Sequence, residues 1–463
     1  MIRGAGWGLS KDKEISANDF EPTEHLSDKH HMAIPWHDFF TNDNFTPAYE
    51  ANLVERAAIV GRIGLMMLSY GTGAWRVRDS MNTVARTLKM TCSVDIGLVS
   101  LEYTCMDAHH SYTQAISLPS TSVNTTKLSQ MERFIKEFDQ NGSEMTIGEI
   151  HSRLEEIAHS KGNYAPYQVG LAAALACSAF VFLLGGGPVE MFCSFIGAGL
   201  GNYVRRKMID HHITLFAGVA VAVAVACLSY LLALSLMQLT FNVSSRHEAG
   251  YIGAMLFIIP GFPFITSGLD ISKLDMRSGL ERMTYAIAII TVATLVGWIV
   301  ALMVNLRPEN FQALPLSALM LFLLRLPASF CGVFGFSIMF NSTPKMAAIA
   351  GCIGAIANTL RLELTDLTGI PAGAAAFLGA LVAGLLASIV KRKIQYPQIS
   401  ITVPSIVIMV PGLYMYRAMY NIGLTSISVG TLWMTKALMI VVFLPMGLIA
   451  ARILTDSKWR HNG

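Results

Sequence analysis

The chain has 463 residues, of which 53% are hydrophobic and 14% are charged, and its mean hydropathy is +0.49. This composition is typical of an integral membrane protein and excludes a wholly soluble one. The formal net charge of +3 is too small to indicate nucleic-acid binding.

The first 160 residues are polar and predict a soluble region ahead of the membrane part. Residues 1–45 lack periodicity and lack the apolar stretch of a secretory signal, so we expect a mobile leader on the cytoplasmic side. Residues 46–162 predict a cytoplasmic soluble α+β domain. Its expected elements are a helix from Ala51, a helix at about 75–89, strand-like runs around 92–102 and 110–118, and amphipathic helices at about 127–139 and 146–159.

Ten apolar segments follow, and several approach the ~20 residues that a helix needs to span a bilayer. They lie at roughly 167–184, 187–204, 213–237, 250–267, 279–304, 313–341, 345–362, 370–390, 399–416 and 427–452. We assign the first five to a membrane half at 163–305 and the other five to a second half at 306–463. The predicted fold class is an α-helical integral membrane protein of about ten transmembrane helices, with an N-terminal soluble α+β domain.

Basic residues alternate between rich and poor connections along the membrane part. Arg205-Arg206-Lys207 and Lys391-Arg392-Lys393 lie in rich connections, whereas Arg246 and Arg307 belong to poor ones. The positive-inside rule then predicts that both termini are cytoplasmic. Because each half has five segments, an odd number, the second half is expected to enter the membrane inverted relative to the first.

An internal repeat supports the same architecture. Two offsets relate the halves: 156 residues for Pro188 and Pro344, Asn202 and Asn358, and Arg205 and Arg361, and 151 residues for Pro260-Gly261 and Pro411-Gly412. Repeats with matched helix-breaking positions are how many secondary transporters build a site near the middle of the membrane. The sequence therefore predicts a 5+5 inverted repeat and a transport function.

Three stretches resemble the threonine/serine exporter (ThrE-type) family, within about residues 50–455. They are GTGAWRVRD at 71–79, PGFPFITSGLD at 260–270 followed by SGLER at 278–282, and the block from Val403-Pro404 through VPGLYMYR at 410–417. The resemblance implies a ten-span inner-membrane exporter of small hydroxy amino acids with both halves in one chain. Relatives whose halves are separate proteins are associated with succinate export, so the resemblance leaves the substrate open.

Two proline-glycine breaks interrupt the short fourth and ninth segments. These are Pro260-Gly261-Phe262-Pro263 and Pro411-Gly412, the latter followed by Tyr414. Proline removes backbone donors and frees carbonyl groups, which are tolerated at membrane depth only beside protein or a water-filled cavity. We therefore predict substrate binding at these breaks, with Thr266 and Ser267 as hydroxyl ligands. Packing kinks are the alternative interpretation.

Four further polar residues occupy matched positions in the two halves. Asn202 and Asn358 face small residues and are candidate substrate ligands or interhelical hydrogen-bonding groups. Arg205 and Arg361 stand at segment ends and are expected to be snorkelling anchors rather than ligands.

Three ionisable residues complete the candidate site. Lys436 would lie near mid-membrane as a substrate ligand if the last helix starts near Thr425, and would snorkel to the surface if it starts at Leu432. Asp270 and Glu190 are the carboxylates selected for proton coupling, although their positions at segment ends also fit solvated or ion-paired roles.

These observations predict a secondary exporter of small neutral amino acids, threonine and serine, coupled to the proton gradient. The chain contains no GxxxxGK[ST], GxSxG or HExxH pattern, so we expect neither ATP-driven transport nor enzyme activity. Its seven cysteines lack CxxC or CxxH spacing, so neither a metal nor a cofactor is expected. The expected partners are a small-molecule substrate and the lipid bilayer, with a homo-oligomer left open. The alternatives are a dicarboxylate exporter and a membrane-anchored sensor.

Overall fold

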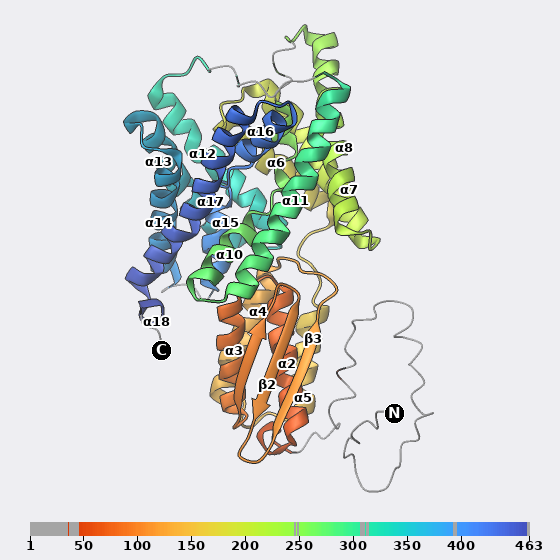
Figure 1. Ribbon diagram of the computed structural model, residues 1–463, viewed down its shortest axis with the longest axis vertical. Coiled ribbons are helices and arrows are strands. Elements are labelled where there is room, and N and C mark those ends of the chain that lie inside the picture. The colour runs from red at the N-terminus through yellow and green to blue at the C-terminus, as the bar shows by residue number, and fades with distance from the viewer. Residues whose placement is uncertain are drawn as a thin grey trace.

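The computed structural model describes Trp36, residues 46–244, His247, residues 250–305, Phe311, residues 314–391 and residues 396–460. The predicted leader at 1–45 lies outside the described residues, apart from Trp36. Arg246, Arg307 and Arg392, which contribute to the predicted charge alternation, also lie outside them. Figure 1 shows two parts, a helical bundle and a smaller N-terminal part below it.

The N-terminal part combines four helices with a three-stranded antiparallel sheet in the order β1-β2-β3. Its elements are α2 (Leu53–Ser69), α3 (Ala74–Thr87), β1 (Thr91–Ile96), β2 (Ser100–Met106), β3 (Ser111–Ser117), α4 (Thr125–Asn141) and α5 (Ile147–His159). One face of the sheet packs on the helices, and Leu101 and Tyr103 on this face are each 1% exposed. The core of this part therefore lies between sheet and helices.

The first strand-like run of the sequence forms two strands rather than one. The chain turns after Gly97, whose N–H donates to the Ser100 carbonyl at 2.8 Å. The turn pairs Cys92 with Cys105 in the antiparallel register of β1 and β2. Alternation of side chains continues across so short a turn, which is why the sequence pattern did not separate the strands.

The bundle consists of long helices and several short ones. They are α6 (Pro166–Leu183), α7 (Pro188–Asp210), α8 (Leu215–Phe241), α9 (Tyr251–Ala254), η4 (Leu256–Ile258), α10 (Gly261–Ser272), α11 (Met276–Met303), α12 (Ala318–Met339), α13 (Pro344–Thr368), α14 (Ala372–Lys391), α15 (Gln398–Val407), α16 (Gly412–Gly423), α17 (Ile427–Thr455) and α18 (Ser457–Arg460). Among the described residues, seven helices are long and apolar enough to cross a membrane, or up to nine if each of two bent pairs is one span. The chain is therefore a multi-pass membrane protein. The second predicted segment corresponds to α7, which is outside this set.

The two bent pairs coincide with the two proline-glycine breaks. The α9–η4 segment meets α10 at 51°, and α15 meets α16 at 50°. Pro260 and Pro411 precede α10 and α16, with backbone angles of φ −80°, ψ 61° and φ −83°, ψ 52°. A proline has no N–H to continue the preceding helix, so at both breaks a new helix begins at the following glycine. The breaks predicted from sequence are confirmed as breaks.

The helices of the two predicted halves have matching neighbours. The packed pairs α6–α7, α7–α8, α8–α11 and α10–α11 recur as α12–α13, α13–α14, α14–α17 and α16–α17. Left-handed residues also recur 151 positions apart, at Leu274 (φ 62°) and Thr425 (φ 65°). In Figure 1, α11 rises from the N-terminal part, whereas α17 descends toward it.

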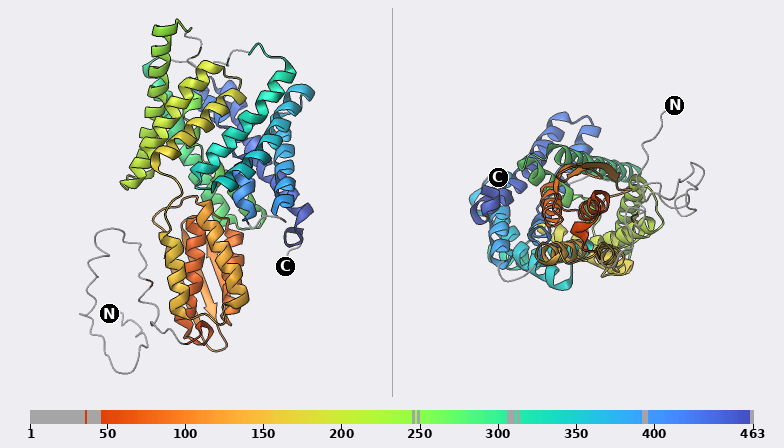
Figure 2. Two further views of the ribbon diagram at one scale, coloured as in Figure 1. Left: turned by 180° about the vertical axis from the view of Figure 1, so that it is seen from behind. Right: turned by 90° about the horizontal axis from the view of Figure 1, so that it is seen from below.

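The N-terminal part lies beneath the middle of the bundle, as the view from below in Figure 2 shows. One contact involves the turn after α12. The Thr125 hydroxyl lies 2.8 Å from the Ser342 hydroxyl, and Asn341 Nδ2 donates to Asn124 Oδ1 at 3.0 Å. The end of α12 is thus hydrogen-bonded to the start of α4.

Candidate functional site

A cavity of about 520 Å³ lies in the bundle, and we call it the bundle cavity. It is bounded by the end of α6, the start of α12, the C-terminal half of α13, the break between α15 and α16, and α17. Because α6 starts beside the N-terminal part and runs away from it, the cavity lies toward the far end of the bundle (Figure 1).

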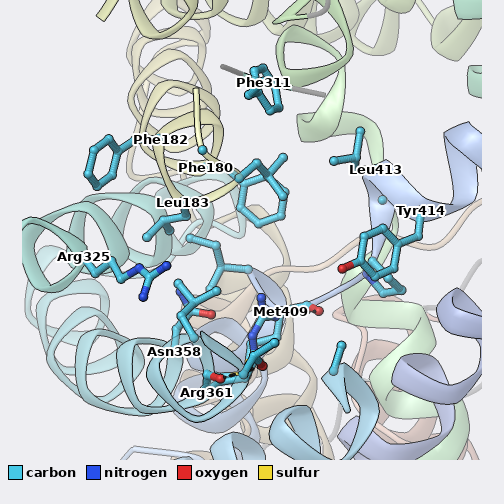
Figure 3. Close-up of a pocket in the computed structure, with 18 of the residues that line it drawn as sticks. Phe180, Phe182, Leu183, Phe311, Arg325, Asn358, Arg361, Met409, Leu413 and Tyr414 are labelled. Carbon is cyan, nitrogen blue, oxygen red and sulfur yellow. Dashed lines mark hydrogen bonds between the residues drawn. The ribbon is translucent and has the colours of Figure 1, made fainter. Parts of the chain in front are cut away.

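The second proline-glycine break forms one wall of this cavity. The wall runs from Met409 through Pro411 and Gly412 to Tyr414. Arg361 on α13 donates from Nη1 to the Met409 carbonyl at 3.2 Å. Its guanidinium thus supplies a hydrogen bond to a carbonyl that lies outside a helix because of the break. In Figure 3, Arg361 and Met409 lie together low in the view, with Tyr414 to their right and Arg325 at the left. Arg361, predicted as a snorkelling anchor, therefore lines the bundle cavity.

Asn358 supplies an unsatisfied acceptor to the cavity. Its side chain is 1% exposed and donates from Nδ2 to the Ser329 hydroxyl at 2.9 Å. Its Oδ1 is buried and has no hydrogen-bond partner within the described part of the chain. Since buried acceptors are normally satisfied, this oxygen is well suited to receive a donor group from a ligand.

Arginines dominate the charge around the cavity. The lining includes Arg325, Arg361 and Arg417, together with one carboxylate, Asp366. Arg325 is paired with Glu363 at 2.7 Å and also with Asp366. The Arg417 guanidinium stacks 4.9 Å from the Trp433 ring centroid. These charges favour a ligand that carries a carboxylate.

The first break is packed against the second rather than open to the cavity. A Cβ added to Gly412 would approach Ile259 Cδ1 to 1.8 Å, and one added to Gly261 would approach Val407 Cγ2 to 2.4 Å. Among the described residues that line the cavity, none belongs to Pro260-Gly261-Phe262-Pro263. The two breaks therefore meet closely, but only the second faces the cavity.

The predicted hydroxyl ligands are both engaged with backbone carbonyls. The Thr266 hydroxyl donates to the Phe262 carbonyl at 3.0 Å, and the Ser267 hydroxyl donates to the Gly279 carbonyl at 2.8 Å. Each side chain is fully buried. The structure brings neither of them to the cavity.

Asn202 and Lys436 also lie apart from the cavity. Asn202 is 3% exposed and donates to the Val169 carbonyl at 3.1 Å, which links α7 to α6. Lys436 is exposed on α17, with Nζ 4.9 Å from the Trp433 ring centroid. The last helix does start near Thr425, at Ile427, but Lys436 lies on its outer face.

Glu190 forms a separate buried pair at the start of α7. Its Oε2 accepts from the Gly187 N–H at 3.0 Å, and its Oε1 lies 2.7 Å from His247 Nδ1. The Glu190 side chain is 3% exposed. The arrangement combines helix capping with a carboxylate–imidazole contact.

Asp270 joins the bundle to the N-terminal part. Its Oδ1 accepts from the Ala74 N–H at 2.9 Å, and its Oδ2 accepts from the Ser278 hydroxyl at 2.9 Å. Oδ2 also forms an ion pair with Arg282, whose Nε lies 3.1 Å away and donates to the Ser278 hydroxyl. Arg282 also donates to the Thr72 carbonyl at 2.7 Å. The stretches at 71–79, 260–270 and 278–282 thus meet at one junction, and Asp270 is not brought to the cavity.

Sequence reasoning missed Arg325, Arg417 and Trp433 as cavity residues. Arg417 ends the third stretch of the family resemblance, three residues after Tyr414, so helical spacing was the available signal. No comparable signal identified Trp433, because it reaches the cavity from a different helix, α17.

Family models match most of the chain. A model described as a putative threonine/serine exporter matches residues 58–305, and a second, described as "Threonine/Serine exporter, ThrE", matches residues 325–454. No solved structure matches the chain.

Three curated proteins are similar at low identity. A probable threonine/serine exporter of Mycobacterium tuberculosis is 22% identical over 80% of this chain and 70% of its own length. Pheromone-regulated membrane protein 10 of Debaryomyces hansenii is 20% identical over 78% of this chain and 36% of its own length. A probable succinate transporter subunit, YjjP, of Escherichia coli is 27% identical over 30% of this chain and 52% of its own length. The chain thus spans less than two thirds of two of these relatives.

Proposed function

Because the chain belongs to the threonine/serine exporter family, we propose that it is a secondary transporter that exports small neutral amino acids, threonine and serine, across the inner membrane. The observation that carries the proposal is the bundle cavity, where Arg361, the unsatisfied Asn358 Oδ1 and a broken helix converge. Its volume of about 520 Å³ suits a small ligand.

A zwitterionic amino acid matches the polar groups of this cavity. The α-carboxylate would bind the Arg361 guanidinium and the amide groups at the start of α16, where the helix dipole also favours an anion. The α-ammonium would donate to Asn358 Oδ1 and to carbonyls of the break. The Tyr414 hydroxyl, farther along the same wall, would meet the side-chain hydroxyl of the substrate.

The proposed architecture is a 5+5 inverted repeat at 163–305 and 306–463, preceded by a cytoplasmic domain at 46–162. Support comes from the matching helix neighbours of the two halves and from the opposite directions of α11 and α17. With both termini in the cytoplasm, the bundle cavity would face the outside, and the junction at Asp270 would close the cytoplasmic side.

Proton coupling would fall to Glu190 and His247 in this scheme. They are the carboxylate and imidazole that contact one another toward the far end of the bundle, at 2.7 Å. The buried, doubly hydrogen-bonded Asp270 then has a structural role in place of the predicted coupling role.

Dicarboxylate export is the second candidate function. It is favoured by the three arginines around the cavity, since a second carboxylate needs a second cation. The second carboxylate of a dicarboxylate would bind Arg417 or Arg325, whereas the ammonium group of an amino acid would bind Asn358.

Substitution of Arg361 tests the proposal. Efflux is measured in cells loaded with precursors that generate threonine, serine or succinate. Arg361→Gln should lower efflux of the true substrate by tenfold or more, because a hydrogen bond to a charged group is worth about 1.5–3 kcal/mol. Asn358→Leu should impair amino-acid efflux but spare succinate efflux. Arg206→Gln is the matched control, because Arg206 is exposed near the end of α7. Wild-type efflux of every substrate by Arg361→Gln would remove this cavity from the transport route.

A further inference from the structure

A second, smaller pocket lies where the N-terminal part meets the bundle, and we call it the junction pocket. It is lined by Thr72, Trp75, Arg76, Lys391, Gln398, Ile399, Arg452, Asp456 and Trp459. Its volume is about 30 Å³, and a groove of about 400 Å³ adjoins it and shares Lys391, Gln398 and Asp456. The junction pocket is separate from the bundle cavity, with which it shares no lining residue among those described.

Three buried donors line the junction pocket without a hydrogen-bond partner in the described part of the chain. They are the Thr72 hydroxyl, Trp75 Nε1 and Arg452 Nε. Thr72 is fully buried and Arg452 is 3% exposed. Buried donors are normally satisfied, so a cluster of three that surrounds one pocket indicates a missing acceptor.

The charge of the pocket identifies that acceptor as an anion. Arg76, Lys391 and Arg452 line it, against the single carboxylate Asp456. Arg76 also contacts Glu132, at 3.0 Å. With Arg76 paired to Glu132, Lys391 and Arg452 still outnumber Asp456, so the remaining excess is positive.

Two indole rings hold the Arg452 guanidinium in place. Its Cζ lies 5.5 Å from the Trp75 ring centroid and 4.7 Å from that of Trp459. Stacked, pre-oriented guanidinium groups are suited to phosphate recognition, because their planar donors match phosphate oxygens. An oxyanion such as a phosphate group therefore fits the pocket better than a halide.

The adjoining groove points to the source of the phosphate. It lies at the ends of α14 and α17, and its lining includes Ile389, which is 60% exposed. An apolar residue this exposed, on a helix long and apolar enough to cross a membrane, is suited to contact lipid. Basic pockets between membrane helices on the cytoplasmic side bind anionic lipid head groups.

We propose that the junction pocket binds the phosphate of an anionic phospholipid whose acyl chains leave along the groove beside Ile389. Thr72 and Trp75 belong to the N-terminal part, whereas Arg452 belongs to α17, so the lipid would bridge the two parts. Bound lipid would therefore stabilise their association. The inference does not depend on which substrate the bundle cavity carries.

Lipid binding can be measured on the whole protein in nanodiscs. Adding phosphatidylglycerol to phosphatidylcholine nanodiscs should raise the unfolding temperature of the wild type, and native mass spectrometry should find phosphatidylglycerol retained. Thr72→Val is nearly isosteric and removes one donor. Trp75→Phe removes the indole N–H and also shortens the ring that stacks on Arg452. Each should weaken the apparent affinity for phosphatidylglycerol about tenfold, as expected for one lost hydrogen bond to a charged group.

Lys207→Gln is the matched control, because Lys207 is an exposed basic residue at the end of α7. It should leave the phosphatidylglycerol effect unchanged. The unfolding temperature in pure phosphatidylcholine reports whether each variant folds. Equal phosphatidylglycerol effects in the control and in both pocket variants would overturn the proposal. A shift that inorganic phosphate alone reproduces in pure phosphatidylcholine, with the same sensitivity to both variants, would also overturn it by identifying a free anion as the occupant.

Discussion

Asp270 uses its two carboxylate oxygens to hold different parts of the molecule. One accepts from the Ala74 N–H of the N-terminal part, and the other is paired with Arg282 within the bundle. Asp270→Asn removes the charge and leaves Arg282 buried beside a neutral amide, a loss of about 3–5 kcal/mol for a buried pair. We expect faster trypsin cleavage between α5 and α6 and weaker efflux, measured on the same membranes.

Asp210→Asn is the control for this change, because Asp210 is an exposed carboxylate at the end of α7. It should alter neither cleavage nor efflux. If Asp270→Asn abolished proton-driven efflux while cleavage stayed at the wild-type rate, the coupling role predicted from the sequence would replace the docking role.

Single polar residues were only partly predictable, for reasons of geometry. Asn358, selected because a short polar side chain in a small-residue helix must meet a partner, lines the bundle cavity. Its repeat mate Asn202 meets the Val169 carbonyl instead, a contact that depends on α6. Thr266 was misplaced because its hydroxyl bonds to the carbonyl four residues earlier, a local option that leaves no trace in the sequence. Lys436 was misplaced because an almost uniformly apolar helix does not reveal which face it exposes.

Among the elements, the two breaks depend on glycine for their mutual contact. Gly412→Ala would bring a Cβ to 1.8 Å from Ile259 Cδ1 and 3.1 Å from Leu256 Cδ2, so the Ile259 side chain must move and the contact between the two broken segments must repack. We expect export to fall strongly while the protein still inserts, because the displaced wall includes Met409, which Arg361 contacts. Efflux normalised to membrane-inserted protein measures this effect.

Gly218→Ala provides the matched control in α8. A Cβ at Gly218 would have no atom within 4 Å among the described residues. Alanine favours a helix interior by about 1 kcal/mol over glycine, so this variant should export normally and be no less stable. Equal export by the two variants would mean that the breaks are packing kinks without a role in the site.

The positions of the breaks could be read from the sequence, since proline cannot donate to the preceding turn. Their unequal exposure could not. The bundle cavity lies on the second break because α6, α12 and α13 surround that side, whereas the first break is covered by Val407 and its neighbours. This difference arises from packing between segments that are distant in the sequence. The repeat offset alone makes the two breaks equivalent and therefore cannot predict it.

For the whole molecule, the inverted repeat and its orientation in the membrane together predict which turns face each side of the membrane. In a cysteine-free background, single cysteines at Ser244 and Thr425 should react with a membrane-impermeant maleimide in intact cells. Cysteines at His212 and Arg277 should react only after the membrane is permeabilised. All four positions are exposed in the structure, so protection reports the side of the membrane rather than burial.

The four positions compare the two halves, because His212, Ser244 and Arg277 lie in the first half and Thr425 lies in the second. Ser244 and His212 flank α8 in the first half. Arg277 lies at the start of α11, directly after the α10–α11 turn, and Thr425 lies in the α16–α17 turn, which corresponds to the α10–α11 turn at an offset of 151. If the halves were parallel repeats, Thr425 would share the side of Arg277. If the halves were inverted but the N-terminal part lay outside, all four results would reverse. Only labelling of Ser244 and Thr425 with protection of His212 and Arg277 leaves the bundle cavity facing outward, as export through an outward-open state requires.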